Sequence, residues 1–128
     1  MSAPMSVFLG TQRSIADLAL DLQRIFGVTL WRIEERDMFR YEHRGLGYRM
    51  TLLTDHGLED DMGIPFSKYK HQIDFDSLGP GAVPEYSEQL KRYVALYAYS
   101  MIIADLKCPA MVVYNLQEKI AVHGEGLG

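Results

Sequence analysis

The sequence predicts an α+β fold, in which an antiparallel or mixed β-sheet of about five to six strands carries two main helices packed on it. Two segments repeat apolar residues at helical spacing, several shorter segments alternate apolar and polar residues, and glycine-containing turns link successive strands. Hairpin-linked strands between two helices favour a sheet with the helices on one face. The length of 128 residues fits a single domain over 1–128, with disordered tails at 1–4 and 124–128.

The first predicted strand is the short apolar run at 7–9, and the first helix follows it. Ser14 suits the N-cap of this helix because its hydroxyl can accept from the backbone of Asp17, three residues on. Gly27 suits the left-handed conformation that ends a helix. Between them apolar residues recur as in a helix with one buried side: Ile15, Leu18, Ala19, Leu22, Ile25 and Phe26.

The remaining strands are predicted from β-branched, aromatic or alternating segments. Gly45-Leu46-Gly47 supplies a hairpin turn between two of them. We expect a charged turn at 34–37 and a loop at 55–65, where glycines and a proline replace apolar residues. The predicted strands are 28–33, 39–44, 48–52, 69–76 and 110–114, the last in a central position. Residues 119–122 are a candidate for an additional edge strand.

The second helix is predicted between two proline signals. After a loop at 77–83, Pro84 and Glu85 suit a first helical turn, and Pro109 stops the helix. From Val94 onward nearly every residue is apolar, so we expect the second half of this helix to be covered on most sides. The side expected to face the core carries Leu90, Tyr93, Val94, Tyr97, Met101 and Ile102.

The net charge of −4 is concentrated in one stretch of the chain. Residues 55–76 contain six acids and two lysines, which gives −4, and the remaining 11 acids and 11 bases cancel. Because such a stretch repels phosphate groups, we expect no nucleic-acid partner. A basic protein or a cation fits the charge better.

Cysteine usage and hydropathy predict a cytoplasmic protein. Cys108 is the only cysteine, which excludes an internal disulfide and favours a reducing compartment. The first residues show no basic region followed by an apolar one, so no signal peptide is visible. The most apolar stretch, 93–106, is too short to span a bilayer, and we expect no contact with a membrane.

No motif typical of catalysis is visible. The four histidines lie in separate predicted elements, and Cys108 follows a helix end, where a thiolate is disfavoured. The acids of 55–61 lack the spacing of a calcium-binding loop. We therefore predict that the protein is not an enzyme and holds no cofactor or metal. The alternative is a small metal- or ligand-binding enzyme domain with a site near Asp55, His56 and Glu59.

Aromatic residues among acids are typical of a protein-binding surface, because the rings anchor a partner and the charges steer it. Phe66, Tyr69 and Tyr86 lie among or beside the acids in this way. We expect the contact surface to combine the acidic loop with the outer face of the strand at 69–76. The predicted partner-binding residues are Asp55, Glu59, Asp60, Asp61, Phe66, Tyr69, Lys70, Asp74 and Asp76.

The run from Asp60 to Phe75, DDMGIPFSKYKHQIDF, resembles a stretch of small bacterial immunity proteins of polymorphic toxin and contact-dependent growth inhibition systems. In these proteins an acidic loop leads to the pattern F-x-x-Y-x-x-x-I on a strand, which Phe66, Tyr69 and Ile73 match here. The order of predicted elements is similar too. The resemblance implies a protein that neutralises a cognate toxin, often a basic nuclease, by binding its active site or an adjacent surface.

Overall fold

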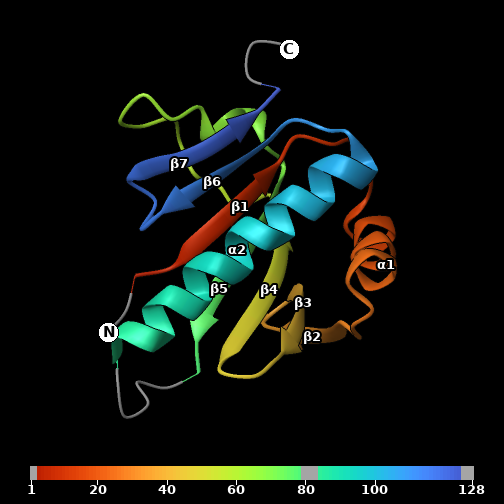
Figure 1. Cartoon of the computed structure of the whole chain (residues 1–128). Coiled ribbons are helices and arrows are strands. Elements are labelled where there is room, and N and C mark those ends of the chain that lie inside the picture. Colours follow the sequence, from red (N-terminus) through yellow and green to blue (C-terminus); the bar gives the residue numbers. More distant parts are fainter. Residues whose placement is uncertain (1–2, 79–83, 125–128) are drawn as a thin grey trace.

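The computed structural model describes residues 3–78 and 84–124, which form a β-sheet, two α-helices and a short 3-10 helix (Figure 1). The predicted α+β class is confirmed. In chain order the elements are β1 (Met5–Leu9), α1 (Ile15–Phe26), β2 (Trp31–Glu35), β3 (Met38–Arg44), β4 (Tyr48–Thr54), η1 (Phe66–Lys68), β5 (His71–Ser77), α2 (Pro84–Leu106), β6 (Ala110–Tyr114) and β7 (Glu118–His123).

The sheet of the described residues has seven strands, slightly more than the five to six expected. Their order is β2-β3-β4-β5-β1-β6-β7, and each neighbouring pair is antiparallel. The first strand of the chain is thus inserted between β5 and β6. As predicted, β6 lies inside the sheet and the last strand, β7, lies at an edge.

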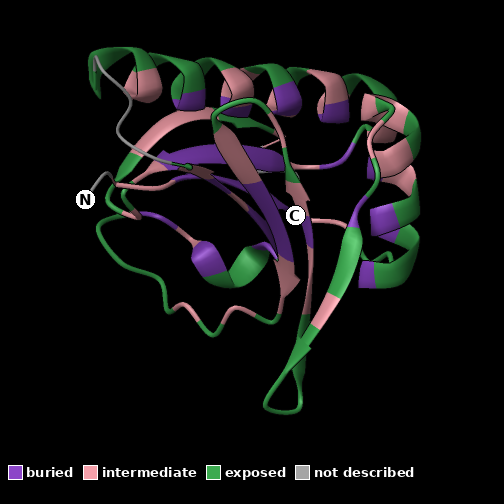
Figure 2. Ribbon diagram, turned by 90° about the horizontal axis from the view of Figure 1, so that it is seen from below, coloured by how far each residue is buried: buried purple, intermediate pink, exposed green. Residues whose placement is uncertain are grey.

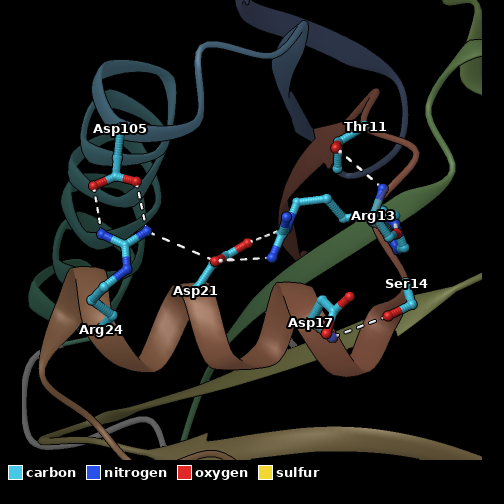
Figure 3. Close-up of polar contacts among 8 residues, drawn as sticks. Thr11, Arg13, Ser14, Asp17, Asp21, Arg24 and Asp105 are labelled. Carbon is cyan, nitrogen blue, oxygen red and sulfur yellow. Dashed lines mark hydrogen bonds and ion pairs between the residues drawn. The ribbon is translucent and has the colours of Figure 1, made fainter.

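Both ends of α1 follow the capping signals in the sequence. The backbone N–H of Asp17 donates to Ser14 Oγ at 3.1 Å, and Gly27 takes the left-handed conformation with φ 66°. On the outer side of α1, Arg24 donates to both carboxylate oxygens of Asp105 on α2, at 2.8 and 2.7 Å (Figure 3). These bonds lower the pKa of Asp105 and tie α1 to the end of α2.

The face of α2 that packs on the sheet matches the predicted one only in part: Ile102 is buried as expected, and two of its tyrosines are not. Tyr93 and Tyr97, expected in the core, are 68% and 60% exposed. Because α2 is apolar around much of its circumference, periodicity alone does not show which side packs. The helix lies on a single sheet face (Figure 2). Its second half is covered on most sides, as expected, because α1 also packs against it and only Tyr97, Ser100, Ala104 and Asp105 are exposed among residues 94–106. Its buried residues are Lys91, Ala95, Ala98 and Ile102.

Lys91 connects the core side of α2 to the start of the chain. Its Nζ donates to the carbonyl of Ala3 and to the carboxylate of Glu88, the latter at 3.1 Å. The carbonyl of Pro4 accepts from the backbone of Asn115 at 2.8 Å. These bonds hold two residues of the predicted disordered tail at 1–4, so the tail prediction is wrong for both. Residues 1–2 and 125–128 lie outside the described residues.

Two predicted strands are displaced along the chain. The strand expected at 28–33 begins later, at Trp31, because the backbone N–H of Leu30 bonds to the side chain of Gln23 on α1. The strand expected at 69–76 runs over His71–Ser77 and is preceded by η1. The turn expected at 34–37 is shorter because β2 continues to Glu35. The Gly-Pro-Gly part of the predicted loop, at 79–81, lies outside the described residues.

The sheet has an apolar core on each face. The helices cover one face, and the segment 55–70, which includes η1, folds over the other face (Figure 2). This second cluster joins the segment to β1 and β6 and consists of Phe8, Ile64, Phe66, Tyr69, Met111 and Val113. The acidic stretch is therefore part of a packed layer of the fold. None of the helices described here is long and apolar enough to cross a membrane.

Candidate functional site

The acidic segment is fixed to the sheet by His56. The ring Nδ1 accepts from the backbone of Leu58 at 3.0 Å, so Nε2 carries the proton and donates to the carbonyl of Tyr69 at 2.6 Å. The ring also meets Phe8 of β1 edge to face, with centroids 5.4 Å apart. His56 thus joins the two ends of the segment and one strand of the sheet.

Two of the predicted contact acids shape the middle of the segment. Asp60 Oδ1 accepts from the backbone N–H of Ser67 at 2.8 Å, and this bond lowers the pKa of Asp60. The backbones of Asp61 and Ile64 exchange two hydrogen bonds, at 3.2 and 2.7 Å, around a tight turn with positive φ at 62–63. Asp60 therefore has a structural role, and its carboxylate is oriented toward η1 as well as toward solvent.

Phe66 and Tyr69 lie in the second core, so their prediction as surface anchors is wrong. They are 2% and 4% exposed, and the Phe66 ring packs against Phe8 with centroids 5.1 Å apart. The 3-10 turn of η1 directs both side chains toward β1 and β6 instead of placing them along an exposed strand. The F-x-x-Y-x-x-x-I pattern is thus a packing pattern, because Ile73 is buried as well.

The acids of β5 do not extend a free acidic surface. Asp74 accepts hydrogen bonds from Ser6 Oγ at 2.6 Å and from Gln72 Nε2 at 2.7 Å, and its burial raises its pKa. Asp76 lies 3.6 Å from a guanidinium nitrogen of Arg49 on β4. Both carboxylates are therefore occupied by neighbouring strands. Lys70, the remaining predicted contact residue of this strand region, is exposed.

Four acids remain exposed on the segment, and we refer to them as the acidic loop: Asp55, Glu59, Asp60 and Asp61. They take part in none of the ion pairs formed among the described residues. Met62, 65% exposed, lies directly beside them at the turn. The structure thus presents a short run of unpaired carboxylates around an exposed apolar side chain.

The alternative site near Asp55, His56 and Glu59 gains no support from the geometry. His56 already uses both ring nitrogens within the segment. Within residues 3–78 and 84–124 no group of three or more His, Cys, Asp or Glu side chains is arranged to hold a metal ion. The buried thiol of Cys108 has its pKa raised by burial, which disfavours the nucleophilic thiolate.

A surface of which the sequence analysis indicated only Tyr86 lies on the outer side of α2. Tyr86, Leu90, Tyr93 and Tyr97 are spaced four, three and four residues apart and are all exposed. We call these residues the tyrosine face. Exposed aromatic side chains grouped in this way are typical of protein-contact surfaces. The weak amphipathicity of α2 could have indicated this exposed face in the sequence. When a helix that is apolar on two sides packs on one sheet, only one of these sides is covered by the sheet.

Comparisons with protein-family models, with curated proteins and with solved structures found no match to this chain. Function is therefore inferred from the exposed surfaces and from the groups that they leave unpaired.

The buried histidine of β5 makes the stability of the fold sensitive to pH. His71 is fully buried, and its Nε2 donates to the carbonyl of Arg13 at 2.7 Å, while Nδ1 has no hydrogen-bond partner among the described residues. Burial lowers the pKa of His71, and the charge of Lys70 lowers it further, against the opposing effects of the Arg13 carbonyl and Asp55. The folded protein therefore holds His71 neutral.

We expect acid to destabilise the protein through His71. Below the ordinary pKa of about 6.5, His71 of the unfolded chain is protonated, whereas His71 of the folded chain stays neutral because its pKa is lower. The free energy of unfolding therefore decreases as the pH is lowered. The free energy of unfolding decreases by at most about 1.4 kcal/mol per pH unit through this group. The decrease stops below the pKa of His71 in the folded protein, where both states are protonated. Urea titrations of wild type and His71→Gln between neutral pH and pH 5 measure this. The other titrating groups contribute equally to both proteins, so the difference between the two free energies of unfolding reports His71 alone. The exposed His123→Gln is the control and should behave as wild type; equal slopes for wild type and His71→Gln would contradict the expectation.

Proposed function

We propose that this protein is an immunity protein that binds a basic toxin domain and neutralises it through the acidic loop. The observation that carries the proposal is the set of exposed carboxylates without ion-pair partners, held on a rigidly anchored segment. Clustered like charges repel one another, and no ion pair among the described residues offsets this repulsion. A basic partner would supply the missing cations.

The resemblance of Asp60–Phe75 to immunity proteins supports a toxin as the partner. The negative charge of the acidic loop supports binding to a basic cleft of that toxin. Toxic nucleases are basic because they hold nucleic acid, so an acidic loop can compete for the same cleft. Met62 offers an apolar contact among the charges, which suits an anchor surrounded by steering groups. The tyrosine face supports the broader class of protein binding.

Replacing Asp55 and Glu59 tests the proposal without disturbing the hydrogen bond from Ser67 to Asp60. Both are exposed, and Asp55 has φ 52°, which asparagine also tolerates. We expect Asp55→Asn with Glu59→Lys to slow association with the toxin domain about tenfold or more, and to weaken the dependence of the association rate on salt. Stopped-flow binding over a salt series measures both, with the protein encoded by the neighbouring reading frame tested as the candidate toxin.

A matched control changes the charge by the same amount elsewhere. Asp37 also has positive φ, 64°, and Glu118 lies exposed on β7, so Asp37→Asn with Glu118→Lys repeats the two substitutions away from the acidic loop. Cells that make the toxin should grow with wild type or the control pair, and should grow poorly with the acidic-loop pair. Full protection by the acidic-loop pair would move the interface elsewhere, and failure of wild type to bind or protect would reject the toxin as partner.

A further inference from the structure

The outer edge of β2 is an unpaired strand edge. β2 bonds to β3 on one side, and no described strand pairs with its other side. Proteins usually protect such edges with charged side chains, above all lysine, with proline, with a bulge or by keeping the strand short. The opposite edge strand, β7, carries Lys119 and a register shift against β6. β2 has no lysine, proline or bulge, and its charged side chains, Arg32, Glu34 and Glu35, are of both signs.

The turn between β2 and β3 shows which backbone groups face the open edge. Residues 36–37 have positive φ, 52° and 64°, and Glu35 lies opposite Met38. This is a two-residue type I′ turn, whose flanking residues exchange both backbone hydrogen bonds. Bonded residues alternate along a strand, so every second residue counted back from Glu35 bonds to β3. The N–H and C=O groups of Arg32 and Glu34 therefore point to the open edge.

We propose that the open edge of β2 binds β2 of a second copy of this chain, antiparallel about a two-fold axis at Ile33. In this pairing Arg32 of each copy lies opposite Glu34 of the other copy. Since the backbone groups of these residues face the edge, each pair exchanges two backbone hydrogen bonds and aligns opposite charges. The two sheets then continue as one across the axis.

The charge pattern of β2 selects this register. Moving the axis by one residue places Arg32 opposite Arg32, or Glu34 opposite Glu34. Like charges directly opposite each other on paired strands are destabilising. The self-pairing centred on Ile33 avoids both clashes, which is why a second copy fits this edge better than a strand of arbitrary sequence.

The side chains of β2 are exposed and already oriented for such a contact. Trp31, 68% exposed, and Ile33 lie on one face of the strand, and in the pair they would lie against Ile33 of the second copy. On the other face the Arg32 guanidinium lies 4.1 Å from the centre of the Phe39 ring and 2.8 Å from the carboxylate of Glu34. Pairing buries the apolar side chains. It also allows Arg32 to form an ion pair with Glu34 of the second copy in place of Glu34 of its own strand.

This interface is independent of the proposed toxin-binding function. β2 is the first strand in the sheet order, whereas the segment that carries the acidic loop packs on β1 and β6. A dimer through β2 therefore leaves both acidic loops open. Because the seam is only five residues long, we expect a dissociation constant on the order of 10 µM.

Charge exchange across the axis gives a sharp test by sedimentation equilibrium of the full chain over a concentration series. In the homodimer, Arg32→Glu places two glutamates opposite each other and Glu34→Arg places two arginines opposite each other, so each variant should raise the dissociation constant about tenfold or more. An equimolar mixture of the two variants relieves these clashes. In the mixed dimer, both facing pairs join a glutamate of one variant to an arginine of the other. The mixture should therefore dimerise as wild type does, and this recovery also shows that both variants are folded.

The emission of Trp31 supplies a second readout, since it is the only tryptophan of the chain. It should shift to shorter wavelength as wild type is concentrated, and should not shift for Arg32→Glu alone. Charge reversal away from the edge, Arg92→Glu on α2 or Glu118→Arg on β7, is the control and should leave the dimer unchanged. A wild-type chain that stays monomeric, a dimer insensitive to Arg32→Glu, or variants that do not recover on mixing would overturn the proposal.

Discussion

Phe66→Ala is expected to lower the free energy of unfolding by about 3–5 kcal/mol, a large share of the total for a domain of this size. The ring fills the second core, where it contacts Phe8 and lies with Ile64, Met111 and Val113. Its removal leaves a cavity between η1 and the sheet that a short 3-10 turn cannot close. Urea unfolding followed by circular dichroism measures the loss.

The same substitution should loosen the segment that carries the acidic loop. The segment is fixed by this core, by His56 and by the hydrogen bond from Ser67 to Asp60. Amide hydrogens near Ile64 and Tyr69 should therefore exchange faster with solvent in Phe66→Ala. Met62→Ala, in the exposed part of the same segment, is the matched control and should change stability by less than about 0.5 kcal/mol. Equal losses for the two variants would show that the second core does not hold the segment.

Leu22→Ala is expected to lower the free energy of unfolding by about 2–5 kcal/mol. Leu22 is fully buried in the main core, where α1 packs on the sheet beside Leu18, and it was predicted there from helical spacing. The truncation removes apolar contacts on the sheet side of α1 and leaves the caps at both ends intact.

Leu20 provides the control for this prediction on the same helix. It is 62% exposed on the opposite side of α1, so Leu20→Ala makes the same chemical change with no core contact. We expect a change below about 0.5 kcal/mol, because alanine also favours the helix slightly. Differential scanning calorimetry of both variants separates the two sides of α1, and similar melting temperatures would mean that α1 does not pack through Leu22.

Much of the fold could be predicted because its signals are local. Ser14 and Gly27 specify the ends of α1 through their own hydrogen-bonding groups and backbone freedom, and the structure shows both caps. Gly45-Leu46-Gly47 allowed the hairpin between β3 and β4 to be placed to within a few residues. The strand count was slightly low because β7, an edge strand, is short and has no buried residue, so its alternation is weak.

The orientation of α2 could not be predicted in the same way. Its residues are apolar on two sides, and spacing alone made Tyr93 and Tyr97 as good a core face as Ala95 and Ala98. Only contact with the sheet distinguishes them, because small side chains allow close approach of the helix and large aromatic rings do not.

The candidate site shows the same division. The concentration of negative charge at 55–76 is a property of the sequence, and four of its acids are exposed as predicted. Which acids are free depends on neighbours distant in sequence: Asp74 bonds to Ser6, and Asp76 lies beside Arg49. Phe66 and Tyr69 were predicted as surface anchors because they are close to acids in the sequence. That prediction was wrong because sequence adjacency does not show which way a side chain points.

By itself the sequence determined the α+β class, the caps of α1, the hairpin between β3 and β4 and the sign and position of the net charge. These features depend on residues close together in the chain. The tertiary structure decided which face of α2 is buried, which carboxylates remain unpaired and which strand edges are open. Those outcomes depend on pairings such as β1 between β5 and β6, where each contact joins residues that only the folded chain brings together.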